Sequence, residues 1–136
     1  MADAVLVVED DASLREMIAQ QLHLAGFAPV TAPNGYEALN LLRMGFPAKV
    51  ILLDLKMPIM DGWAFRAEQR RDPQLADIPV IVMTARDATG VDAAAVFHKP
   101  FNEQEIIDVA RELCAAYTRR HPGSGVHRFR RPEQRT

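Results

Sequence analysis

The chain has very little cysteine and few aromatic side chains. It contains one cysteine and one tryptophan in 136 residues. A single thiol, Cys114, cannot form a disulfide within the chain, which excludes the small disulfide-stapled scaffolds of secreted proteins. No apolar run approaches the roughly 18 residues of a membrane-spanning helix, and no basic segment precedes the apolar run Val5–Val8 as in a signal peptide. We therefore expect a protein of the reducing cytoplasm.

Positive charge is scarce in the first 118 residues and concentrated after them. Residues 1–118 hold 10 Lys and Arg against 17 Asp and Glu, a net charge of −7, whereas residues 119–136 hold six Arg against one Glu, a net charge of +5. We predict one domain over 1–118 and a basic, disordered tail or linker over 119–136. Although Arg128–Arg131 combines charge with an aromatic ring, we interpret the tail as solvated rather than as a nucleic-acid contact.

Short runs of β-branched and apolar residues predict a sheet of parallel strands that are buried on both faces. The five predicted strands are Ala4–Val8, Phe27–Ala32, Val50–Leu53, Val80–Met83 and Val96–Phe97. Pro29 indicates that the second of them lies at an edge of the sheet, because proline cannot donate to a neighbouring strand.

Helical periodicity occupies the segments between these strands. The predicted helices are Leu14–Ala25, Tyr36–Met44, Trp63–Arg71 and Glu103–Tyr117. Ser13 and Glu16 form a capping-box pattern at the first helix, and Gly26 is placed to end it. Residues 85–95 contain few large apolar side chains, so any helix there is expected to be short. The alternation predicts an α/β fold with helices on both faces of the sheet.

Polar side chains follow the predicted strands at the sheet edge where α/β proteins bind ligands. They are Glu9, Asp10, Asp11, Asp54, Thr84 and Lys99. Two carboxylates about 4 Å apart repel by ~4 kcal/mol at an effective dielectric of 20, so a cation is needed there, and oxygen ligands suit Mg²⁺. With Lys99 and the Thr84 hydroxyl, such a site can hold a phosphoryl group in line with a carboxylate nucleophile, for which we choose Asp54.

Four segments resemble the receiver domains of two-component response regulators, and the resemblance covers about residues 4 to 117. The segments are Val5–Asp11, Leu52–Gly62, Val80–Ala85 and His98–Phe101. The resemblance implies a doubly wound, flavodoxin-like sheet of order 2-1-3-4-5 and a cis Lys99–Pro100 peptide. It implies that Glu9, Asp10, Asp54 and the backbone carbonyl of Lys56 bind Mg²⁺. It also implies that Asp54 is the phosphoacceptor, while Thr84 and Lys99 hold the phosphoryl oxygens.

The function implied by this resemblance is a phosphorylation-activated switch in a phosphorelay. A histidine kinase or histidine phosphotransfer protein would supply the phosphoryl group. The domain would assist its own phosphorylation and dephosphorylation without being an enzyme. With no effector domain in this sequence, we expect either a stand-alone receiver that acts on a separate protein or a domain cut from a larger protein. Neither the target nor an oligomeric state follows from the sequence.

Two departures from the family pattern concern the output surface. Val96 occupies the position at which receivers carry a switching aromatic side chain. Thr84 and Lys99 are fifteen residues apart, which is shorter than the family spacing by roughly seven residues, or about two helical turns. The fourth helix should therefore be shortened, which places the usual output surface in doubt but not the phosphorylation chemistry.

Three other functions are compatible with parts of the pattern. A pseudo-receiver would keep the fold without using the phosphate, as Val96 and the short fourth segment suggest. The residues expected to bind metal and phosphate argue against it, because all are present: Glu9, Asp10, Asp54, Thr84 and Lys99. A haloacid dehalogenase-like phosphohydrolase would need an acid two residues after the nucleophile, where this sequence has Lys56. A flavin phosphate would be repelled by the three acids after the first strand, and no phosphate-binding loop is present.

Several other residues have ordinary structural interpretations. Asp11 is interpreted as a solvent-facing residue or helix cap rather than a metal ligand. Cys114 lies on the apolar stripe of the last helix and is interpreted as core, and Trp63 as a packing residue that could lie near the site. The histidines show no metal-ligand spacing; they are His23, His98, His121 and His127.

Overall fold

The central element of the fold is an all-parallel five-stranded sheet. The computed structural model describes residues 2–122, so most of the predicted basic tail lies outside the described residues and its disorder stays a prediction. The strands are β1 (Ala4–Val8), β2 (Ala28–Ala32), β3 (Val50–Asp54), β4 (Val80–Thr84) and β5 (Ala95–His98). Their order is β2-β1-β3-β4-β5, which confirms the predicted topology and the edge position of the strand that contains Pro29.

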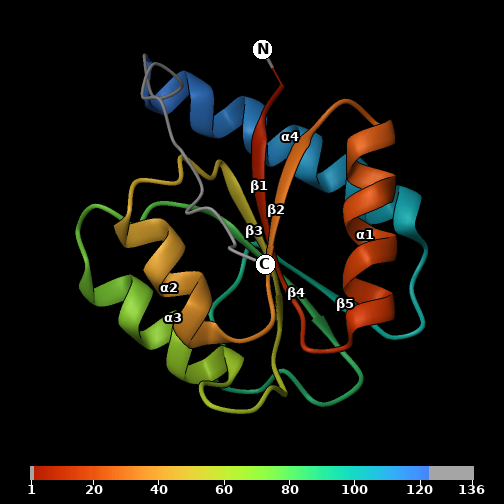
Figure 1. Ribbon diagram of the computed structural model, residues 1–136. Coiled ribbons are helices and arrows are strands. Elements are labelled where there is room, and N and C mark those ends of the chain that lie inside the picture. The colour runs from red at the N-terminus through yellow and green to blue at the C-terminus, as the bar shows by residue number, and fades with distance from the viewer. Residues whose placement is uncertain (1, 123–136) are drawn as a thin grey trace, which may run out of the picture.

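Helices cover both faces of this sheet. Within residues 2–122 they are α1 (Ala12–Leu24), α2 (Gly35–Arg43), α3 (Gly62–Arg71) and α4 (Glu103–Arg120). Figure 1 shows α1 and α4 on one face and α2 and α3 on the other. The last helix extends three residues beyond the predicted Tyr117 and so takes in the first two residues of the segment that was predicted as tail.

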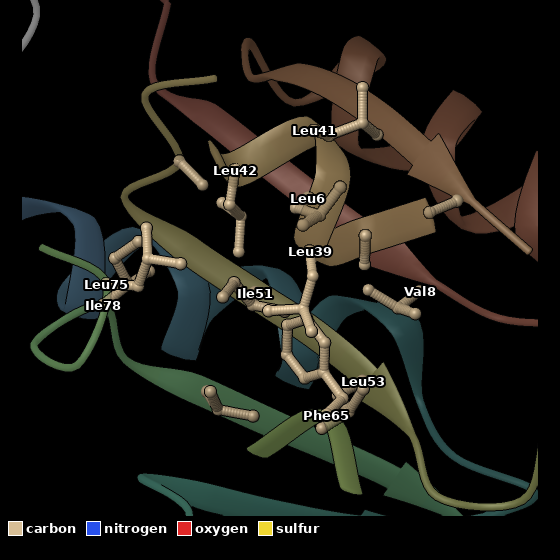
Figure 2. Packing of buried hydrophobic residues seen from close by; sticks show 14 of the residues in the cluster. Leu6, Val8, Leu39, Leu41, Leu42, Ile51, Leu53, Phe65, Leu75 and Ile78 are labelled. Atoms are coloured by element: carbon tan, nitrogen blue, oxygen red, sulfur yellow. The ribbon is translucent and has the colours of Figure 1, made fainter. Parts of the chain in front are cut away.

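Two apolar layers hold the helices against the sheet. Under α2 and α3, Phe65 and Leu39 lie over Ile51 and Leu53 of β3 (Figure 2). A second layer of buried residues under α1 and α4 includes Leu22. Complete burial of a Leu or Phe side chain contributes about 1.5–3 kcal/mol, and every residue of β3 is buried. The continuous apolar runs of the central strands thus reflect helices on both faces.

Asp11, not Ser13, caps the first helix. The Asp11 carboxylate accepts a hydrogen bond from the backbone N–H of Leu14 at 3.1 Å, and the helix begins at Ala12. The predicted Ser13–Glu16 capping box is therefore wrong, because Ser13 already lies inside the first turn. The interpretation of Asp11 as a helix cap is confirmed. Gly26 follows the helix with φ +97°, a conformation that favours glycine.

No helix forms in residues 85–94, all of which the structure describes. The shortened helix predicted between β4 and β5 is replaced by a non-helical segment, consistent with its lack of large apolar residues. Its absence leaves Val96 of β5 40% exposed. Among the described residues, no helix is long and apolar enough to cross a membrane.

Cys114 should be chemically inert in the folded protein. Its side chain is fully buried in the core, and burial raises the pKa of the thiol to about 12. Because the thiolate is the reactive form, a folded-state pKa far above its unfolded value keeps this thiol protonated at about pH 8.

We expect iodoacetamide to label the native chain at least about tenfold more slowly than the urea-unfolded chain, as intact-mass measurements would show. Equal labelling rates in the two states would contradict the burial of Cys114.

Candidate functional site

The carboxyl ends of the strands surround a cavity of about 330 Å³ at one edge of the sheet. The residues predicted to hold metal and phosphoryl group all line it; they are Glu9, Asp10, Asp54, Lys56, Thr84 and Lys99. Glu9 and Asp10 directly follow β1, Asp54 and Thr84 end β3 and β4, and Lys99 follows β5. The strand order places β1 next to β3 and β4 next to β5, so residues that are up to 90 positions apart meet at this edge.

Three carboxylates form the acidic half of the cavity. Glu9, Asp10 and Asp54 each offer an oxygen, and these oxygens lie within 4.8 Å of one another. Glu9 is fully buried, Asp54 is 5% exposed, and Asp10 faces solvent. A small set of hard oxygen donors with one open side fits Mg²⁺, which binds through a few carboxylates and keeps several of its waters.

Lys99 is the cation that contacts this cluster. Its Nζ lies 2.7 Å from Oε1 of Glu9 and 3.5 Å from Oδ1 of Asp54. A buried carboxylate such as Glu9 is stable in the ionised form only with close hydrogen-bonding partners. Glu9 also accepts a hydrogen bond from the backbone N–H of Asp11 at 3.2 Å.

The pKa shifts follow from this crowding. Burial raises the pKa of Glu9, and the neighbouring Asp54 raises it further. Burial and then the proximity of Glu9 raise the pKa of Asp10. Burial by itself would lower the pKa of Lys99, but its bond to Glu9 and the charge of Asp54 outweigh that effect and raise it. Three carboxylates and one ammonium leave an excess of negative charge that a divalent cation would neutralise.

Thr84, the last residue of β4, is almost fully buried, with 1% exposure. Its Oγ1 accepts a hydrogen bond from the backbone N–H of Arg86 at 2.9 Å. Its backbone carbonyl accepts one from the N–H of Lys99 at 2.8 Å. The Thr84 hydroxyl retains its own proton for donation to an anion in the cavity.

Gly62 allows α3 to begin directly against the end of β3. A Cβ at this position would lie 2.7 Å from the carbonyl oxygen of Asp54 and 2.7 Å from the Cα of Leu55. The Gly62 N–H donates to the carbonyl of Leu55 at 2.8 Å, which closes the loop between β3 and α3. On the opposite side of the cavity, the Lys99–Pro100 peptide is cis, as the resemblance implied.

Two residues at the site were missed by sequence reasoning. Arg15 of α1 donates from Nη1 to the backbone carbonyls of Glu9 and Asp10 at 3.0 and 3.4 Å, which holds the acidic turn in place. Arg86 also lines the cavity. Arg15 lies a few residues after the predicted site residues Glu9 and Asp10, and Arg86 lies two residues after Thr84. Nothing in this spacing distinguishes the two arginines from solvated side chains.

The chain is similar to one family of known proteins. The sequence profile described as response regulator receiver domain matches residues 5–111. The probable transcriptional regulator ycf27 of Guillardia theta is 37% identical over 139 residues, which cover 93% of this chain and 53% of that protein. The chain thus spans about half the length of the curated relatives it matches.

Solved structures share the fold of this chain. The chemotaxis response regulator CheY4 of Vibrio cholerae is 28% identical with a TM-score of 0.75, over 83% of this chain and 99% of that one. The receiver domain of the sensor histidine kinase PA1611 from Pseudomonas aeruginosa PAO1 is 21% identical with a TM-score of 0.77. The match covers 85% of this chain and 99% of the PA1611 receiver chain, which was solved with a magnesium ion coordinated in its active site cleft.

Replacing Gly62 by alanine should destabilise the site and the fold together. The added methyl group would meet backbone atoms of Asp54 and Leu55, which cannot move without shifting β3, and such overpacking costs about 1–3 kcal/mol. Urea unfolding would measure the change in the free energy of unfolding.

Ala67→Ser is the matched control, because Ala67 lies on the exposed face of the same helix and surface substitutions change stability by only about 0.5 kcal/mol. A Gly62→Ala variant as stable as the wild type would show that the start of α3 is not closely packed against the end of β3.

Proposed function

The chain belongs to the response regulator receiver domain family, and from this membership we propose that Asp54 accepts a phosphoryl group from a histidine kinase or histidine phosphotransfer protein. The observation that carries the proposal is the position of the Asp54 carboxylate. It lies 5% exposed at the end of a fully buried strand, in a cavity that Lys99, Thr84 and the converging carboxylates of Glu9 and Asp10 also line.

The transfer step follows from this arrangement. An Asp54 oxygen attacks the phosphorus of a phosphohistidine, the bond from phosphorus to the histidine nitrogen breaks, and the released imidazole takes up a proton. The product is an acyl phosphate on Asp54. Lys99, already 3.5 Å from Oδ1 of Asp54, would pair with the transferred phosphoryl oxygens, and the Thr84 hydroxyl would donate to one of them. Neither residue needs to change its protonation state.

Glu9, Asp10 and Asp54, with the backbone carbonyl of Lys56, are the residues proposed to hold Mg²⁺. The three carboxylates converge, and their donor chemistry fits a hard cation. When bound, the ion would offset the negative charge shared by the carboxylates and the phosphoryl oxygens. Glu9 then has a second task, because the same carboxylate contacts Lys99 at 2.7 Å and so aligns the ammonium with the nucleophile.

The alternative functions are less well supported. A pseudo-receiver has no use for the buried carboxylates of Glu9 and Asp54 beside Lys99, whose desolvation costs stability. A phosphohydrolase would need a proton shuttle at the position that Lys56 occupies. We propose that the domain acts in the cytoplasm as a phosphorylation switch and that its phosphorylated form signals by changing its contacts with a protein target.

Acetyl phosphate with Mg²⁺ should add one phosphoryl group to the chain, as intact-mass spectrometry would show. Asp54→Asn should abolish the adduct because an amide cannot form the acyl phosphate, and chelation of Mg²⁺ should suppress it.

Asp61→Asn is the matched control. Asp61 caps α3 through the backbone N–H of Ala64 at 2.8 Å, and asparagine caps helices as well as aspartate, so this variant should be labelled like the wild type. An unmodified wild-type chain, or an adduct that persists in Asp54→Asn, would contradict the proposal.

A further inference from the structure

We propose that Asn34–Gly35 is a site of spontaneous covalent modification, where the chain loses ammonia and the asparagine becomes aspartate or isoaspartate. The packed domain holds this pair unreactive, and the reaction proceeds only in molecules in which this corner of the fold has opened. The sequence has three asparagines, and only Asn34 precedes a glycine. The inference does not depend on the phosphorylation of Asp54.

The reaction is an attack of the backbone nitrogen of Gly35 on the side-chain carbonyl carbon of Asn34. The new carbon–nitrogen bond closes a succinimide ring, the bond from Cγ to Nδ2 breaks, and Nδ2 leaves as ammonia with the proton that the Gly35 nitrogen gives up. Water then opens the ring at either carbonyl, which leaves an aspartate or an isoaspartate. A following glycine favours ring closure because it has no side chain to obstruct the attack.

Close packing accepts only glycine at position 35. A Cβ there would lie 2.9 Å from Cγ of Met60, 2.9 Å from the carbonyl oxygen of Met60 and 3.0 Å from Cβ of Phe65. The start of α2 thus approaches the loop between β3 and α3 more closely than a residue with a side chain allows. The fold therefore requires the glycine that makes this pair chemically labile.

The side chain of Asn34 is the N-cap of α2. Its Oδ1 accepts a hydrogen bond from the backbone N–H of Glu37 at 2.9 Å, and its Nδ2 donates to Oε2 of Glu37 at 3.4 Å. Aspartate caps helices as well as asparagine through the first of these contacts. It has no donor for the second contact, however, and would place two carboxylates together. The amide is therefore the group that satisfies both contacts with Glu37.

The same contacts block the reaction in the folded protein. The N–H of Gly35 donates to the carbonyl of Met60 at 3.0 Å, so the attacking nitrogen can lose its proton only by giving up that hydrogen bond. Asn34 is 4% exposed, and its amide must leave the cap contact with Glu37 before the ring can close. The rate should therefore follow the fraction of molecules in which this corner is open.

The two products differ in whether they can return to the fold. Aspartate leaves the backbone unchanged and still accepts the hydrogen bond from the N–H of Glu37. Isoaspartate inserts a methylene into the backbone between Cα of residue 34 and the nitrogen of Gly35. With this extra bond, residue 34 cannot cap α2 while Gly35 reaches the carbonyl of Met60. The isoaspartyl chain therefore cannot rebuild the corner, and the pair records irreversibly that a molecule has opened.

Peptide mapping by mass spectrometry tests the site and its protection by the fold. The native and the urea-unfolded chain are incubated in the same mildly alkaline buffer, and the replacement of an amide by a carboxyl group is followed at each asparagine. We expect modification of Asn34 to be at least about tenfold slower in the native chain, because only open molecules react. Equal rates in the two states, or a mass gain at Asn40 or Asn102 instead, would overturn the proposal.

A pair of cap variants assigns the reaction to the pair. Asn34→Asp has no amide to lose, so the mass gain of the unfolded chain should disappear. Asn102→Asp is the matched control: Asn102 also caps a helix, through the N–H of Gln104 at 2.8 Å, but it precedes Glu103, whose side chain obstructs ring closure. This variant should gain mass in urea at the rate of the wild type, and a gain that persists in Asn34→Asp would contradict the assignment.

Refolding separates the two products. Chains that were modified in urea are returned to native buffer, and size-exclusion chromatography isolates the compact monomer. The peptide that contains residue 34 should carry aspartate but be depleted of isoaspartate in this fraction. The analysis is made on that peptide alone, because Asp61–Gly62 can form the same ring without a change of mass. An isoaspartate content at residue 34 equal to that of the unfractionated chain would refute the exclusion of the isoaspartyl product from the fold.

Discussion

The contact between Lys99 and the buried carboxylates of Glu9 and Asp54 is the interaction on which the site depends. Glu9 has no exposed surface, and an unpaired charge there would cost several kcal/mol. The ammonium at 2.7 Å offsets that cost, but it is a single contacting cation for three converging carboxylates. Burial raises the pKa of Glu9 and that of Asp10, and the neighbouring carboxylates raise both further. This negative cluster has the donor chemistry that suits a divalent ion.

The fold carries this charge cluster on an apolar support. The strands below the cavity are continuous runs of buried aliphatic side chains, and the two helical layers seal both faces. Parallel strands bring all their carboxyl ends to one edge, so a polar residue after each strand faces the same cavity. Close packing also determines the loops, because α3 can start against Asp54 only where Gly62 carries no Cβ.

A shortened connection between β4 and β5 leaves the residues of the cavity in place. No helix forms in residues 85–94, and Val96 of β5 is exposed. The connection takes its partners from α3 instead, through Trp63 and Arg66. Thr84 at the end of β4 and Lys99 directly after β5 lie at its two ends, and both line the cavity.

The sequence by itself determined the five strands, the four helices that form and the polar residues that gather at one edge of the sheet, because buried parallel strands read as uninterrupted apolar runs and the polar residues follow them directly. It misplaced the first helix cap, since Asp11 and Ser13 are both good caps and only the path of the chain selects between them, and it allowed a short helix between β4 and β5 where none forms. The pairing of Lys99 with Glu9 across 90 residues, the support of the acidic turn by Arg15 and the contacts of residues 85–94 with α3 were decided by the tertiary structure alone. These are contacts between elements, and local periodicity carries no information about which surfaces meet once the sheet is assembled.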